Sequence, residues 1–142
     1  MKILIAVDGS SHSLAAVTSV IDHAGWYREK PAVELLTVHL PVPTLHGFSA
    51  LIGAQHYERY YREEGGQRLA AAREKLDAAG IRYATHIMVG QIAESIVEKA
   101  LNTGCDLICI GSRGLGDLGR ALLGSTATKV LHLSDLPVLL VK

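Results

Sequence analysis

The chain has 142 residues, of which 49% are apolar and 20% are charged. These values are typical of one globular domain, expected over residues 1–142. Fourteen basic residues balance fourteen acidic ones, so no overall charge favours binding to nucleic acid or to an anionic membrane. No apolar stretch approaches the length of a membrane span. We therefore expect neither nucleic acid nor membrane as a partner.

Apolar runs and periodic patterns predict five strands and four helices that alternate along the chain. The strands are expected at Ile3–Val7, Val33–Val38, Arg82–Val89, Leu107–Ile110 and Pro137–Val141. The helices are expected from the capping residues Ser10 and Ser11 to Ala24, from Gln55 to Ala79, from Gly90 to Leu101, and from Ser125 to about Leu133. Glycines close to the ends of the first three helices supply stops.

Two segments have unusual patterns. Gly65 and Gly66 lie in the middle of the long helical stretch, so we expect an irregularity there or a helix that begins properly only near Gln67. The strand at Arg82–Val89 has one apolar and one mixed face, which favours a position at the edge of the sheet.

Alternating strands and helices predict an α/β fold: a parallel, Rossmann-like sheet with right-handed crossovers and helices on both faces. The apolar strands from Ile3 and Leu107 belong at the centre, which gives the order 3-2-1-4-5. Its topological switch point lies between the first and fourth strands, where ligands of open α/β sheets bind. The chain there reads Asp8-Gly9-Ser10 after the first strand and Gly111 to Gly114 after the fourth.

The stretch from Ile110 to Ser125 contains five of the 14 glycines and joins a strand to a helix. Glycine lets its backbone N–H turn towards a ligand and allows close approach, and a helix N-terminus adds free N–H donors, so the pattern predicts an anion site. Gly114 to Gly119 matches G-x-G-x-x-G, but a dinucleotide fold needs more strands after it. Gly119 to Ser125 has P-loop spacing without the lysine.

A third spacing, Gly111-x2-Gly114-x9-Gly124-Ser125, resembles the nucleotide-binding signature of the universal stress protein family. The resemblance covers the whole chain, including Ile-Ala-Val-Asp-Gly-Ser near the start and Leu-Pro-Val-Leu-Leu-Val-Lys at the end. It implies the 3-2-1-4-5 fold of adenine nucleotide alpha hydrolase-like proteins and binding of ATP or a related adenine nucleotide. It also implies dimerisation through the last strand and a nucleotide-dependent role in the stress response.

The resemblance also implies roles for individual residues. Asp8 would lie against the ribose or a phosphate-linked metal such as Mg²⁺, and Val38 would offer its backbone to adenine. Gly90 and Ile92 would lie on the adenine side. The phosphates would be surrounded by Gly111, Arg113, Gly114, Gly124, Ser125 and Thr126. Arg113 adds positive charge and Ser125 a hydroxyl donor.

Simpler explanations remain open for several of these residues. Asp8 could begin the cap of the first helix, completed by Ser10 or Ser11. None of the seven histidines has metal-ligand spacing, and most are expected at the surface. His39, directly after Val38, is the histidine expected to approach the ligand. The alternatives to an ATP-binding regulator are a slow Mg²⁺-dependent ATPase using Asp8, or an interaction dimer that binds AMP, cyclic AMP or nothing.

The last strand, Pro137–Val141, is apolar throughout although the order places it at an edge. An exposed apolar edge invites pairing, so we expect a homodimer through this strand; coverage by its own helices, with Pro137 blunting the edge, is the alternative. Cys105 and Cys109 have a C-x3-C spacing that fits neither a zinc nor a C-x-x-C redox site. We expect buried, reduced thiols in a cytoplasmic protein.

Overall fold

The computed structural model describes residues 1–42, 50–114 and 123–142. The elements in chain order are β1 (Lys2–Ala6), α1 (Ser11–Asp22), the 3₁₀ turn η1 (Ala24–Trp26), β2 (Ala32–His39), α2 (Ala50–Ala78), β3 (Tyr83–Val89), α3 (Ile92–Asn102), β4 (Leu107–Gly111), α4 (Ser125–Leu133) and β5 (Val138–Val141). The five predicted strands and four predicted helices are therefore all present. Two of the five glycines between Ile110 and Ser125, Gly116 and Gly119, and one of the seven histidines, His46, lie outside the described residues.

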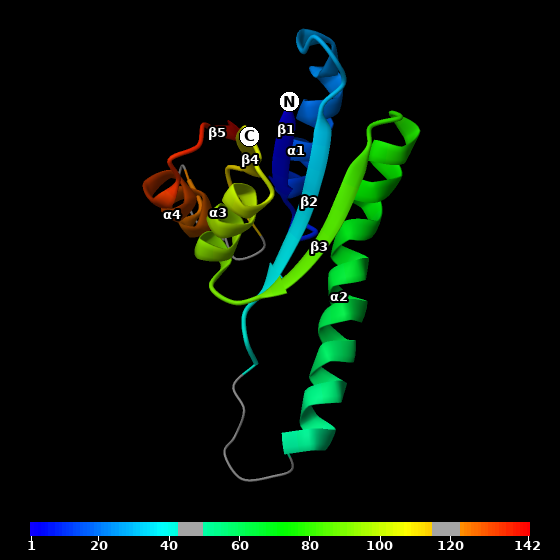
Figure 1. Cartoon of the computed structure of the whole chain (residues 1–142), viewed down its shortest axis with the longest axis vertical. Helices are drawn as coiled ribbons and strands as arrows, with labels where there is room; N and C mark the ends of the chain where they lie inside the picture. Colours follow the sequence, from blue (N-terminus) through cyan, green and yellow to red (C-terminus); the bar gives the residue numbers. More distant parts are fainter. Residues whose placement is uncertain (43–49, 115–122) are drawn as a thin grey trace.

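The five strands form one parallel sheet in the order β3-β2-β1-β4-β5 (Figure 1). The predicted order, and the edge position of β3, are confirmed. In register, Ala6 of β1 lies between Leu36 of β2 and Ile110 of β4. The carboxyl ends of β1 and β4 therefore meet at the switch point, as the predicted topology requires.

Side chains alternate between two cores, one on each face of the sheet. The first core packs β1 residues such as Ile5 against α1 and α2. The second packs Leu4 and Ala6, from the other face of β1, against α3 and α4. Both faces of the central strands are covered, which explains why β1 and β4 are apolar runs rather than alternating patterns.

Both cysteines are buried and neither forms a disulfide, as predicted. Cys109 lies in the core under α1, and burial raises the pKa of its thiol to about 12. A thiol with this pKa stays protonated near neutral pH, so Cys109 is a packing residue rather than a nucleophile.

Helix α2 corrects the expectation about Gly65 and Gly66. It is one helix from Ala50 to Ala78, without an interruption and with a start well before Gln67. Figure 1 shows it running past the carboxyl ends of β2 and β3. Gly65 is buried where α2 crosses β3: a Cβ there would lie 2.8 Å from Cγ2 of Ile87. The glycine thus permits close packing of the helix on the strand.

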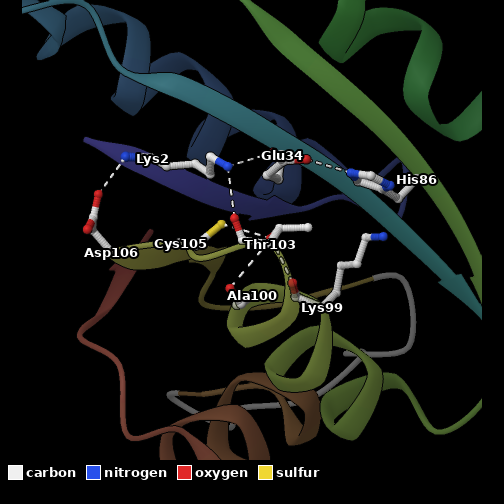
Figure 2. Close-up of polar contacts among 8 residues, drawn as sticks. All are labelled: Lys2, Glu34, His86, Lys99, Ala100, Thr103, Cys105 and Asp106. Atoms are coloured by element: carbon white, nitrogen blue, oxygen red, sulfur yellow. Dashed lines mark hydrogen bonds and ion pairs between the residues drawn. The ribbon is translucent and has the colours of Figure 1, made fainter.

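A polar network occupies the amino ends of the strands, opposite the switch point (Figure 2). One carboxylate oxygen of Glu34 on β2 lies 2.6 Å from Nε2 of His86, and the other lies 3.6 Å from Nζ of Lys2. Lys2 also donates to the carbonyl of Thr103 and, through its backbone N–H, to Asp106. These contacts tie β1, β2, β3 and the end of α3 together.

Across the three described ranges, the structure has no helix that is both long and apolar enough to cross a membrane.

Replacing each of the two adjacent glycines of α2 by alanine should change stability in opposite directions. A Cβ at Gly66 meets nothing within 4 Å, so Gly66→Ala should raise the free energy of unfolding by about 0.5–1 kcal/mol through helix propensity. Gly65→Ala should lower it by about 1–3 kcal/mol through overpacking against Ile87. Urea denaturation of both variants measures the difference.

The double variant Gly65→Ala/Ile87→Ala is the control, because it removes the branched side chain that the new methyl group would meet. In the Ile87→Ala background, Gly65→Ala should no longer destabilise. Equal effects of the two alanine substitutions in the native background would contradict the packing role of Gly65.

Candidate functional site

The site begins where β1 ends early. Even-numbered residues of β2 hydrogen-bond towards β1: Leu36 O accepts from the Val7 N–H at 2.8 Å. Odd-numbered residues bond towards β3, since His39 O accepts from the Gly90 N–H at 2.8 Å. The backbone N–H and C=O of Val38 therefore face the side of β2 where β1 runs, at a point beyond the end of β1. Within the described ranges no backbone hydrogen bond outside the strand ladders uses the N–H or C=O of Val38.

A pocket of about 580 Å³ opens at this point. This volume lies within the range of pockets that hold small organic ligands. Nine residues predicted for the site line it: Asp8, Val38, Ile92, Gly111, Arg113, Gly114, Gly124, Ser125 and Thr126. The other lining residues are Ala6, Val7, Ser13, Leu36, Arg68, Ile96, Ile110, Leu123 and Ala127.

The pocket has an apolar and a polar part. The apolar part lies on the sheet face that α3 and α4 cover, and its side chains belong to that core or pack against it; they include Leu36, Ile92, Ile96 and Ile110. The polar part is formed by the loop after β1, the residues after β4 and the first turn of α4. A flat apolar group and a charged group joined to it would match these two parts.

The loop after β1 shows why Asp8 has its position. One oxygen of Asp8 accepts a hydrogen bond from the Ser10 N–H at 2.9 Å, and Ser10 is the N-cap of α1, its hydroxyl accepting from Ser13 N–H. Gly9 between them has φ +87°, which favours glycine. The simple capping explanation therefore holds for one oxygen of Asp8, while the residue also lines the pocket.

The first turn of α4 lies in the polar part of the pocket and has backbone amides without a partner among the described residues. Its N-cap is Gly124, which has no side chain to cap the helix. Among the described residues no hydrogen bond uses the N–H groups of Ser125, Thr126 or Ala127, as expected for the first residues of a helix. All three residues line the pocket. The helix dipole adds a positive potential at this end.

Gly124 corrects the expectation that the glycines of the motif expose their own N–H groups. The Gly124 N–H donates to Ser112 O at 2.7 Å, within the protein. Gly111 ends β4 against α1, and a Cβ there would lie 2.6 Å from the His12 carbonyl oxygen. Its small size serves packing. Gly114 lies beside the pocket carboxylate, because a Cβ there would lie 2.7 Å from Oδ2 of Asp8.

Four residues chosen from the sequence do not line the pocket: Gly9, Ser10, His39 and Gly90. His39 is the clearest correction. As an odd-numbered residue of β2 it points to the opposite face from Val38, under α2, where its ring lies 5.3 Å from that of Tyr61. Burial, and next the positive charge of Arg68, lower the pKa of His39. A buried, neutral histidine under a helix is a packing residue.

The sequence analysis missed the contribution of α2 to the site. Arg68 lines the pocket, although nothing in its helical spacing marks it. Ser13, Leu36 and Ile96 were also missed. Leu36 could have been found, because side chains two apart on a strand share a face and Val38 was already chosen.

In the described part of the chain, no group of three or more histidine, cysteine, aspartate or glutamate side chains is placed to hold a metal ion. The role of Asp8 beside a phosphate-linked metal stays a prediction.

Known proteins resemble the chain along its whole length. The model of the universal stress protein family matches residues 1–142. Universal stress protein YxiE of Bacillus subtilis is 32% identical, over 99% of this chain and 98% of its own. The solved structure of protein MJ0577, a universal stress protein of Methanocaldococcus jannaschii, has a TM-score of 0.79 at 29% identity and covers 99% of this chain and 94% of its own.

A universal stress protein solved in complex with cAMP shares the fold, with a TM-score of 0.70 at 24% identity over 100% of this chain and 97% of its own. The fold and the match of the family model over residues 1–142 therefore indicate the same family. The chain belongs to the universal stress protein family.

Proposed function

We propose that the pocket binds an adenine nucleotide, with ATP as the expected ligand, and that binding controls a protein interaction in the stress response. One observation carries the proposal: the uncapped first turn of α4 and the free backbone edge of Val38 line the same pocket. The first suits phosphate and the second suits the edge of a base.

The apolar part of the pocket would hold the adenine. Leu36, Ile96 and Ile110 supply buried apolar contacts for the flat ring, on the sheet face beneath α3. The N–H and C=O of Val38 are a donor and an acceptor on the side of β2 that β1 leaves open. This pair is complementary to the edge of a purine, which also presents both kinds of group.

The polar part would hold the phosphates. The amides of Ser125, Thr126 and Ala127 are donors aimed along the axis of α4, and the two hydroxyl groups and Arg113 add to them. Charge-assisted hydrogen bonds of this kind are the strong ones. Asp8 would contact the ribose, or a metal bound to the phosphates.

Solved proteins of the same fold support the class of ligand. A universal stress protein of Arabidopsis thaliana was solved with AMP bound, and another universal stress protein was solved in complex with cAMP. Their likeness to this chain, at 16% and 24% identity, extends to the fold. Our choice of an adenine nucleotide for this chain therefore depends on the pocket described above.

Ser125→Pro tests whether the first amide of α4 binds phosphate. Proline is tolerated at the first helical position and removes the N–H. The preceding residue, Gly124, has φ −69° and ψ 154°, which suits a residue before proline. Losing one donor to a charged group should weaken ATP binding by about 1.5–3 kcal/mol, roughly tenfold or more in the dissociation constant measured by calorimetry.

Ser125→Ala is the matched control, since it removes the hydroxyl group but keeps the amide. It should bind ATP more tightly than Ser125→Pro, and both variants should keep the thermal unfolding midpoint of the apo protein. Equal ATP affinities for the two variants would count against the amide as a phosphate ligand, and no binding by the native protein would end the proposal.

We also propose a homodimer that pairs through the exposed edge of β5. In the described chain β5 pairs only with β4, and Leu139 on it is 38% exposed. The native protein should elute at about twice its 15.2 kDa monomer mass in light-scattering chromatography. Leu139→Lys should give the monomer, because a charge on an edge strand opposes pairing.

Leu101→Lys is the control for added charge, because Leu101 on α3 is 52% exposed and lies away from β5. A monomeric native protein, or a dimer that survives Leu139→Lys and dissociates in Leu101→Lys, would overturn the proposed interface.

A further inference from the structure

Arg68 brings a second cation to the pocket from an element that the nucleotide motif does not include. It lies on α2, on the opposite side of the sheet from α3 and α4, and its side chain is 28% exposed. It lines the pocket together with Arg113, which follows β4. The pocket is therefore flanked by positive charge from two separate parts of the fold.

The fold fixes the position of Arg68. Its stem packs on the loop after β1: a Cβ on Gly9 would lie 3.6 Å from Cγ and 3.7 Å from Cα of Arg68. Its guanidinium is 3.4 Å from Glu64, one turn earlier on α2. The charge of Arg68 also lowers the pKa of His39, so the guanidinium acts near the carboxyl end of β2.

Two parts of the pocket lining approach neighbouring residues of the loop after β1. Gly114 lies against the carboxylate of Asp8, while Arg68 lies against Gly9, the next residue. Arg68 therefore brings its charge to this loop at a contact separate from that of Gly114. Because the first turn of α4 lines the same pocket, we expect a chain of two or three phosphates, rather than a single phosphate, to reach from α4 to Arg68.

The charges of the lining favour this arrangement. Among the described residues, the charged side chains that line the pocket are Asp8, Arg68 and Arg113. Each further phosphate adds negative charge that one arginine cannot balance alone, and the planar fork of arginine suits phosphate oxygens. The pair of Arg68 and Glu64 is a partly exposed i,i+4 helix pair that contributes little net stability, so a phosphate can replace the carboxylate as the partner of Arg68.

We propose that Arg68 contacts the terminal phosphates of the bound nucleotide and makes the pocket selective for nucleoside di- and triphosphates over monophosphates and cyclic nucleotides. This inference rests on the proposed function, because it concerns the same pocket. It adds a residue and a preference among ligands to that proposal.

Calorimetric titration of ATP, ADP, AMP and cyclic AMP into the native protein and into Arg68→Gln tests the proposal. Arg68→Gln should weaken ATP binding about tenfold, the loss of one charge-assisted contact, and should leave AMP and cyclic AMP within about twofold. The native protein should prefer ATP to AMP, and the variant should lose most of that preference.

Arg73→Gln is the matched control, because Arg73 is an exposed arginine on the same helix and its removal changes the net charge equally. It should leave all four affinities unchanged. Circular dichroism melts of both variants check that α2 remains folded.

The outcomes separate the two proposals. An equal loss for all four ligands in Arg68→Gln, or no loss for any, overturns the inference while leaving nucleotide binding in place. A native protein that binds none of the four ligands overturns the proposed function, and the inference with it.

Discussion

The early end of the central strand is the constraint on which the site depends. β1 stops at Ala6, while β2 continues from Leu36 to His39 and stays paired with β3. The stop has a local cause. The carboxylate of Asp8 accepts a hydrogen bond from the Ser10 N–H, and Gly9 between them has a positive φ, so the chain turns out of the sheet. The turn leaves one edge of β2 without a partner strand, and α4 begins across the gap. A pocket with donors on both sides follows from this geometry.

The two ends of the sheet have different tasks. At the amino ends, ionic side chains satisfy one another: Glu34, 13% exposed, is held between Lys2 and His86 (Figure 2). At the carboxyl ends, backbone groups of Val38 and of the first turn of α4 have no partner in the described chain. Polar groups are thus paired at the amino ends and left open at the carboxyl ends, which is where ligands of open α/β sheets bind.

The fold could be predicted from the sequence because its signals are local. Apolar runs such as Ile3–Val7, helical spacing and glycine stops each depend on a few neighbouring residues, and alternation then limits the topology. Four of the nine pocket residues, Asp8, Gly111, Arg113 and Gly114, lie in the loops after β1 and β4 that the strand order brings together. The resemblance to the universal stress protein family supplied the other five: Val38, Ile92, Gly124, Ser125 and Thr126.

What could not be predicted depends on contacts between distant segments. Gly65 looked like a helix breaker, because its role is set by Ile87 on β3, 22 residues later. His39 was assigned to the ligand by its neighbour Val38, although successive strand residues face opposite ways. The amide of Gly124 is used by Ser112, and Arg68 reaches the pocket from α2. The error for His39 could have been avoided from strand alternation alone, whereas the contacts of Gly65, Gly124 and Arg68 leave no pattern in the local sequence.

Amide chemical shifts during an ATP titration test the central claim most directly, because they report on the backbone groups themselves. In ¹H–¹⁵N spectra we expect the largest changes at Ser125, Thr126 and Ala127 and at Val38, with little change at Lys2 and His86 at the other end of the sheet. Saturating ATP that leaves the α4 amides unchanged, or shifts chiefly the amino end of the sheet, would contradict the account.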